Sequence, residues 1–394
     1  MTRLSYLPAR VYLFLYQFKH LFRCPQARHF LLFCSMLVAL IIHQGKGKIK
    51  SLVLITPKCI KYWALMRMIR SKQWDPTELL HEMSRHVLRT LPPPSDLTLH
   101  LMADKTLKEK RGENNPFCRK TRINQYAPYS FGIEVVILLV SWGTYRIAVD
   151  IEVMDPKIAG HQNILFREML ERFNPPKWAS NVIVEADSGF SSNQNIKAIE
   201  KKGYYYVLAI PRTRKFANGK YVRDLVKHLP KTHYHRVATR KVDGRRKDYW
   251  VYSKREKLNG LGEVTILLSK RRRNEGPKNV KIIVTNLKGA TDGEILSNFA
   301  RRWQIEVAIK ELKSGLHLGQ MQVSKEAGRI KRSMVLSVAA YLLLVHLYGR
   351  EAGGKESMSL FKLKQRFTTE VYEEALESSR KKWKEKLKKL KAAA

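Results

Sequence analysis

Residues 97–104 read LTLHLMAD, and residues 181–187 read NVIVEAD. Each is a short apolar run that ends on an aspartate, and runs of this kind predict strands. Other patterned segments lie between and after these two. We predict strands at 133–142, 145–153 and 204–210, and helices at 161–173 and 193–202. The predicted order is therefore three strands, a helix, a strand, a helix and a strand.

This is the order of an RNase H-like α/β domain that lacks only its last helix. In such a sheet the first and fourth strands are neighbours, so Asp104 and Asp187 would meet at one edge. An aspartate after a strand is often only a turn or helix-capping residue. For either aspartate alone we favour that structural role, and their joint placement favours a functional site.

The missing helix comes late in the chain. Short alternating segments between 211 and 290 predict a β-rich insertion, and a long helix is then predicted over Glu294–Leu316. A second, very apolar helix is predicted over Ser333–Tyr348, packed inside. We expect five regions: a helical N-terminal DNA-binding domain (1–95), an RNase H-like catalytic core in two parts (96–210 and 291–350), the β-rich insertion (211–290) and a basic helical C-terminal region (351–394).

The N-terminal region has helical periodicity up to a break at Leu91-Pro92-Pro93-Pro94. Within it, residues 46–69 have the spacing of a helix-turn-helix, with a turn near Thr56-Pro57 and basic residues suited to a DNA backbone. A plain helical hairpin fits the same residues equally well. The apolar run Phe30–Ile42 has 13 residues, fewer than a membrane span needs. We expect it to be a buried helix and expect no membrane association.

Composition points to a polyanionic partner. The 394 residues include 74 Lys and Arg against 34 Asp and Glu, a formal net charge of +40. A charge excess of this size destabilises a compact fold unless an anion offsets it, and nucleic acid is the natural candidate because binding releases counterions. The four cysteines show no paired spacing, which indicates reduced thiols. The HEMSRH stretch spaces His81 and His86 five apart, so it does not form the zinc-binding helix of metalloproteases.

The segment 301–316, RRWQIEVAIKELKSGL, carries the third candidate acid. Its apolar residues recur at helical spacing and predict the buried face: Ile305, Ile309, Leu312 and Leu316. Glu306 lies on an adjacent face with three basic residues, Arg302, Lys310 and Lys313. An exposed ion pair of Glu306 with Lys310 is the alternative for this acid.

Phosphodiester chemistry explains why three carboxylates would be gathered. Two hard cations about 3.5–4 Å apart stabilise the attacking and leaving oxygens, and Mg²⁺ prefers carboxylate ligands. We therefore predict Asp104, Asp187 and Glu306 as catalytic residues and ligands of two Mg²⁺ ions, with Mn²⁺ as a substitute. Among rival acids, Asp150 and Glu152 would follow the third strand, the wrong one, and Glu185 would point to the other face of its strand.

The helix at 299–313 resembles the signature helix of bacterial insertion-sequence transposases of the DDE class that carry a β-rich insertion. That signature is a Tyr, an Arg, a Glu and a Lys, and this chain has Phe299, Arg302, Glu306 and Lys313 at the same spacings. Phenylalanine lacks the hydroxyl of the signature tyrosine. The segments ADKTLKEKRG around Asp104 and EADSGFSS around Asp187 are also similar to the family's aspartate motifs, and the resemblance covers about residues 98–345.

The resemblance implies cut-and-paste transposition. The element's ends would be hydrolysed, and the freed 3′-hydroxyls would attack target DNA. It also implies double-stranded DNA as the partner, a homodimer assembled on that DNA, and a place in the bacterial cytoplasm with the nucleoid. Some relatives hold a flipped base on an aromatic residue. Trp250 is a candidate, although cross-strand packing is the more common role, and Trp303 is disfavoured because it adjoins the core of the signature helix.

Basic residues predicted to hold DNA phosphates form three groups. The signature helix contributes Arg302, Lys310 and Lys313. The segment after Asp104 contributes Lys105, Lys110 and Arg111, and the insertion contributes Arg245, Arg246, Arg271 and Arg272. Two other functions fit the same residues: a metal-dependent DNA nuclease without strand transfer, and an inactive DNA-binding protein descended from a transposase.

Overall fold

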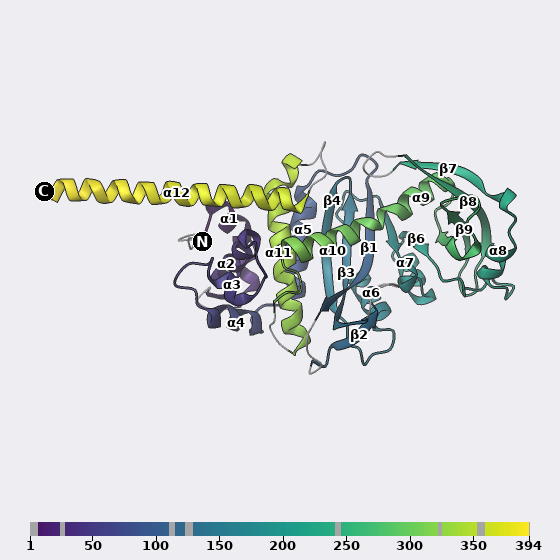
Figure 1. Cartoon of the computed structure of the whole chain (residues 1–394), viewed down its shortest axis with the longest axis horizontal. Coiled ribbons are helices and arrows are strands. Elements are labelled where there is room, and N and C mark those ends of the chain that lie inside the picture. Colours follow the sequence, from purple (N-terminus) through teal and green to yellow (C-terminus); the bar gives the residue numbers. More distant parts are fainter. Residues whose placement is uncertain are drawn as a thin grey trace.

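The apolar runs of the sequence form one large mixed sheet, with helices on both faces and at one end (Figure 1). The computed structural model describes residues 7–23, 28–109, 115–122, 129–240, 246–321, 325–352 and 359–393. The strands are β1 (Thr98–Glu109), β2 (Cys118–Arg122), β3 (Tyr129–Trp142), β4 (Tyr145–Val153), β5 (Asn181–Ala186), β6 (Tyr205–Ala209), β7 (His235–Arg240), β8 (Arg246–Lys257), β9 (Glu263–Lys270) and β10 (Lys281–Thr285).

The strand order is β2-β3-β1-β5-β6-β10-β9-β8-β7, and β4 pairs with the remaining part of β3. β1 is parallel to β5 and β5 to β6, whereas β3 runs antiparallel to β1 and to β4. The expected adjacency of the first core strand and the strand before Asp187 is therefore present. The strands β7 to β10 come from the region expected as an insertion, and they continue the same sheet through the pairing of β10 with β6.

β1 is longer than the sequence indicated. We expected this strand to end at Asp104, and it continues to Glu109. The reason is its antiparallel pairing with β3, which runs without a break from His100 to Glu109. Its pairing with β5 stops at Ala103. The short strand β2, which pairs with the start of β3, was not expected at all.

Two hydrophobic clusters pack helices against the sheet. The larger one includes buried residues of α6 (His161–Arg172), α7 (Asn193–Lys201) and α10 (Trp303–Gly315), and the smaller one packs α9 (Asp292–Arg301) against β5, β6 and β8 to β10. A single helix was expected over Glu294–Leu316, but it is divided at Arg302. The apolar stripe of α10 is buried as predicted, with Ile305, Ile309, Leu312 and Leu316 all in the core.

Helices fill the N-terminal part of the chain between residues 9 and 90. They are α1 (Ala9–Tyr16), the 3₁₀ turn Lys19–Leu21, α2 (Arg28–Ile42), α3 (Ile49–Val53), α4 (Tyr62–Arg70) and α5 (Pro76–Thr90). α3 and α4 are the two helices expected within residues 46–69, but residues 54–61 separate them, a longer connection than the 3–4-residue turn of a helix-turn-helix. The other helices are α8 (Val222–His228), α11 (Ala327–Ala352) and α12 (Leu360–Ala393), and short 3₁₀ turns occur at Ser188–Phe190, Lys231–His233 and Pro277–Asn279.

α11 is the central helix between the N-terminal helices and the sheet, and it contacts α2, α5 and β4 (Figure 1). By length and composition, Ala327–Glu351 could cross a membrane, but 78% of its most apolar window is buried inside the protein. Its apolar character is therefore accounted for by core packing, as expected for Ser333–Tyr348.

Gly132 offers a direct test of the pairing that extends β1. A Cβ atom at this position of β3 would lie 2.4 Å from the carbonyl oxygen of Lys108 on β1. We expect Gly132→Ala to destabilise the protein by about 1–3 kcal/mol, the usual cost of overpacking, measured as a lower thermal midpoint. Gly262→Ala, where the new methyl would meet no atom within 4 Å, is the control, and equal midpoints for the two variants would contradict the described register.

Candidate active site

Two predicted acids follow the last residue pair between β1 and β5. Ala103 pairs with Ala186 in parallel register, so the next residue in each chain, Asp104 and Asp187, stands at the same level of the sheet. Neighbouring strands lie about 4.8 Å apart. Beyond this level β5 has ended while β1 continues beside β3, and the two aspartates stand where the strands part.

The surroundings of Asp104 disfavour its ionised form. Burial, together with the nearby acids Glu306 and Asp187, raises the pKa of this carboxyl to about 6. The backbone N–H of Lys105, which donates to Asp104 Oδ1 at 2.7 Å, and the guanidinium of Arg302 act in the opposite direction. Asp104 is therefore in electrostatic contact with both of the other predicted acids.

Asp187 has no capping role in this structure. It occupies the N-cap position of the 3₁₀ turn Ser188–Phe190, yet its side chain makes no capping hydrogen bond. Its side chain is exposed at the end of β5. The common structural explanation for an aspartate at a turn therefore does not account for this residue.

Glu306 lies in the first turn of α10 and faces Asp104 across an open cavity. Its carboxylate forms an ion pair with the guanidinium of Arg302 at 2.8 Å. The Glu306 side chain is 31% exposed and the Arg302 side chain 13%. The expected alternative partner, Lys310, is not the one used. The cavity has a volume of about 450 Å³ and is lined by Asp104, Lys105, Glu306, Ile309, Lys310, Lys313 and Ser314.

Carboxylates are the donors that a hard cation prefers, and the charges of Glu306 and Asp187 raise the pKa of Asp104. In the part of the chain that the structure describes, however, no three acidic, histidine or cysteine side chains stand close enough to enclose one ion. Glu306 is engaged by Arg302 instead. The chemistry of the site thus fits a divalent cation, while its side chains are arranged around an internal ion pair.

Glu185 was expected on the other face of its strand, and that expectation was wrong. Residues two apart on a strand share a face, so Glu185 lies below Asp187 on the same side. It is fully buried, and its Oε1 accepts a 2.6 Å hydrogen bond from His100 Nδ1. Burial raises the pKa of Glu185, although His100 and the charges of Arg301 and Arg302 act in the opposite direction. The buried His100–Glu185 pair therefore lies on the same face of the sheet as the two aspartates.

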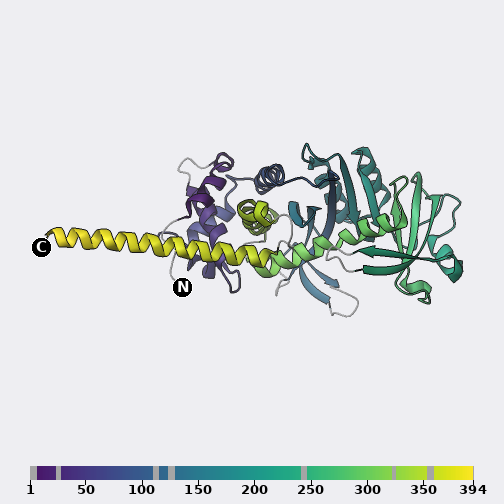
Figure 2. The same cartoon turned by 90° about the horizontal axis from the view of Figure 1, so that it is seen from above.

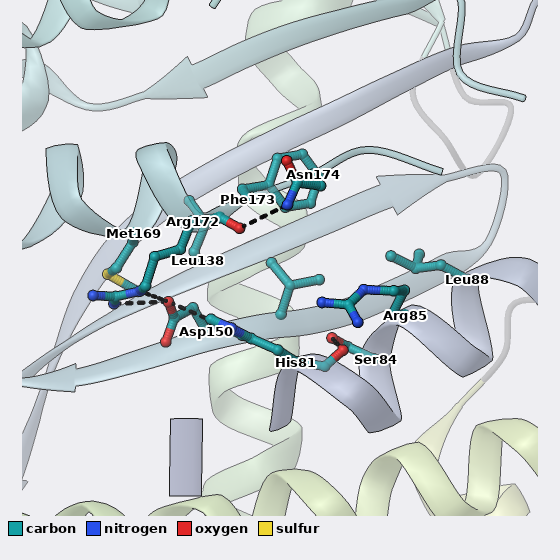
Figure 3. A pocket seen from close by; sticks show the side chains of 11 residues that line it. His81, Ser84, Arg85, Leu88, Leu138, Asp150, Met169, Arg172, Phe173 and Asn174 are labelled. Atoms are coloured by element: carbon teal, nitrogen blue, oxygen red, sulfur yellow. Dashed lines mark hydrogen bonds and ion pairs between the residues drawn. The ribbon is translucent and has the colours of Figure 1, made fainter. Parts of the chain in front are cut away.

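Asp150, the rival acid, has a structural role. It was expected to follow its strand, but it lies within β4, only 1% exposed. His81 Nε2 on α5 is 3.1 Å from one of its oxygens, and Arg172 on α6 donates to the same oxygen at 2.9 Å (Figure 3). Arg172 also binds Glu152 at 2.7 Å. These partners explain why Asp150 is not available to a substrate.

Three of the predicted phosphate-binding lysines line the cavity, namely Lys105, Lys310 and Lys313. Two of them already have partners: Lys105 Nζ is 2.9 Å from Glu134, and Lys313 Nζ donates to the carbonyl of Leu107 at 2.9 Å. Burial lowers the pKa of Lys313. In the insertion, Arg271 and Arg272 are exposed. Lys110, Arg111 and Arg245 lie outside the described residues, and Arg246 is placed only by its backbone in β8.

The aromatic residues differ from expectation in one respect. Trp250 is half-buried on β8, and the guanidinium of Arg273 lies 5.2 Å from its ring centre. Trp303, which we disfavoured as adjoining the core, is in fact 58% exposed at the start of α10. Phe299 packs beside a hydrophobic cluster, with Lys281 and Arg302 at 5.2 and 5.9 Å from its ring centre.

Comparison with known proteins shows similarity to one family and to a solved structure. Residues 160–343 match the model of a family described as "Transposase DDE domain", a range that includes Asp187 and Glu306 and begins after Asp104. One similar solved structure is piggyBac transposase, determined by cryo-EM as a synaptic complex with hairpin DNA. Its TM-score is 0.48 at 11% identity, over 94% of this chain and 78% of that one. No curated protein matches the chain. The predicted resemblance is confirmed over this range: residues 160–343 match a transposase DDE domain.

Proposed function

We propose that this protein is a cut-and-paste DNA transposase, which cleaves the ends of an insertion sequence and joins them to target DNA. The observation that carries the proposal is that Asp104 interacts electrostatically with Asp187 and Glu306 and lines an open cavity with Glu306 and three lysines, in a chain that has a transposase DDE domain. The formal net charge of +40 suits a DNA partner. We place its action on the DNA of the bacterial cytoplasm.

We further propose that β1, β3, β4, β5 and β6, with α6, α7 and α10, form an RNase H-like catalytic core. The support is topological: the first core strand lies beside the strand before Asp187, and the third acid comes from a helix over the same face. The strands β7 to β10 are then the insertion of the family, built as an extension of the sheet.

In this proposal the three acids hold two Mg²⁺ ions, for which Mn²⁺ substitutes. Bound metal would activate the attacking water or 3′-hydroxyl and stabilise the leaving oxygen. Asp104 lies within β1 and Asp187 directly follows β5, so the sheet fixes both backbones before DNA arrives. Glu306 must be released from Arg302, and the freed guanidinium can then bind a phosphate bidentately. Lys310 and Lys313 lie along the same cavity and would hold the strand next to the scissile bond.

The test uses a supercoiled plasmid that carries the two natural ends of the element, incubated with the purified protein and a second, target plasmid. We expect excision of the DNA between the ends and its insertion into the target in Mg²⁺ or Mn²⁺, and neither step in EDTA. Because two ends are cut and joined together, we propose that the acting form on DNA is a homodimer.

Two results would replace this proposal with another function. Metal-dependent cutting without joining would identify a nuclease that lacks strand transfer. Tight DNA binding without cutting, in both metals, would identify a DNA-binding relic and would remove the catalytic roles assigned to the three acids.

A further inference from the structure

The last helix, α12, leaves the body of the protein. Its first part is anchored: Glu370 accepts hydrogen bonds from Tyr348 at 2.8 Å and from Arg366 at 2.9 Å, and it also pairs with Arg10. Leu360, Leu363, Phe367 and Val371 are buried. Glu374 is still 3.6 Å from Arg10, and beyond it the helix continues to Ala393 and projects past the other elements in two perpendicular views (Figures 1 and 2). A long stretch of helix therefore has no partner within the described chain.

The projecting part carries apolar side chains at a regular interval. Leu376 and Trp383 are seven residues apart and are 59% and 65% exposed, and Leu390 follows seven residues later in the sequence. A seven-residue apolar repeat places such residues along one side of a helix and is the pattern of a coiled coil. A helix much longer than 25 residues with this pattern also points to a coiled coil rather than to an isolated helix.

Charge along α12 is divided into two blocks. Residues 373–379 contain three glutamates and no lysine or arginine, whereas residues 380–391 contain eight lysines and arginines and one acid. Two copies aligned in parallel would bring like blocks together, which is destabilising. Two antiparallel copies would place the acidic block of each beside the basic block of the other. The blocks therefore favour an antiparallel pair.

We propose that residues 373–393 of α12 are a self-association surface, which pairs antiparallel with the same segment of a second copy around Leu376 and Trp383. The role of this surface rests on the proposed transposase function, because it would be the contact between the two protomers of the homodimer. Double-stranded DNA is a less suitable occupant. On a DNA backbone the apolar seam would stay in water, and Glu373 and Glu377, both exposed, would repel the phosphates.

The first experiment is sedimentation analysis of the full-length protein without DNA over a range of concentrations. We expect a reversible dimer, and we expect the double variant Leu376→Asp/Trp383→Asp to raise its dissociation constant by at least about a hundredfold, since two large apolar side chains lose their burial. Leu54→Asp is the matched control, because Leu54 is a similarly exposed leucine (56%) on the N-terminal helices. It should leave the dissociation constant unchanged.

A charge exchange tests the orientation. Glu373→Lys with Glu377→Lys should weaken the dimer, and adding Lys382→Glu with Lys386→Glu in the same chain should restore it, because both blocks are then reversed. A parallel pair would not show this rescue. The proposal would be overturned if the wild-type protein stayed monomeric and the Leu376/Trp383 variant lost DNA affinity. In that case the helix would be a DNA-binding element. A dimer that fails to cut DNA would leave this proposal standing and count only against the transposase activity.

Discussion

Asp104→Asn should abolish strand cleavage and leave the fold and DNA binding in place. The substitution keeps the size of the side chain and removes a negative ligand from the point where β1 and β5 part. Losing metal stabilisation of the reacting oxygens would raise the activation free energy by several kcal/mol. The cleavage rate would then fall on the order of a thousandfold or more. The measurement is the rate of end cleavage in Mg²⁺, with DNA affinity measured in parallel by gel shift.

Asp96→Asn is the matched control for this variant. Asp96 lies just before β1, exposed, and its Oδ1 accepts a hydrogen bond from the backbone of Thr98, a contact that asparagine retains. It should cut at the wild-type rate. If Asp104→Asn also cut normally, Asp104 would not be a catalytic acid, and the assignment of the site would have to move.

Asp150→Ala should have the opposite profile, with a large loss of stability and no specific effect on chemistry. Asp150 is buried, and its removal leaves His81 and Arg172 without the carboxylate that joins α5, β4 and α6. Breaking a buried pair of this kind costs about 3–5 kcal/mol, and we expect the lower part of that range because Arg172 keeps Glu152. The midpoint of denaturant unfolding measures the loss.

The same residue predicts how stability depends on pH. His81, Arg172 and Lys331 hold the pKa of Asp150 below its usual value of 3.8. The stabilising contribution is therefore complete above the unfolded value and is lost as the pH falls through the lower, folded value. The stability difference between wild type and Asp150→Ala should shrink below about pH 4. A constant difference from neutral to strongly acidic pH would show that the ion pairs carry none of the effect.

Much of the site could be predicted because its residues follow strong patterns. Apolar runs that end on Asp104 and Asp187 mark two strands, and the periodicity of α10 places Glu306 beside its buried stripe. The length of β1 could not be predicted in this way. Lys105, Lys108 and Glu109 resemble a solvated loop in the sequence, and only pairing with β3 draws them into a strand.

Other features depend on tertiary contacts that no local pattern contains. Glu185 could have been placed correctly by the two-residue repeat of a strand, but its partner His100 comes from a different strand. The division of the signature helix at Arg302 and the exposure of Trp303 have no marker in the sequence. Nor does the sequence show that Arg302 would form an ion pair with Glu306.

The pairing of β10 with β6 has a consequence for any attempt to shorten this chain. Because β7 to β10 extend the central sheet, residues 235–285 cannot be removed as a detachable module. Their deletion would strip β6 of its neighbour and leave a row of unsatisfied N–H and C=O groups along an apolar strand, two positions from the one that carries Asp104. Bare edges of this kind recruit other chains, so a minimised protein would be expected to aggregate unless a new edge strand or charged residues protected β6.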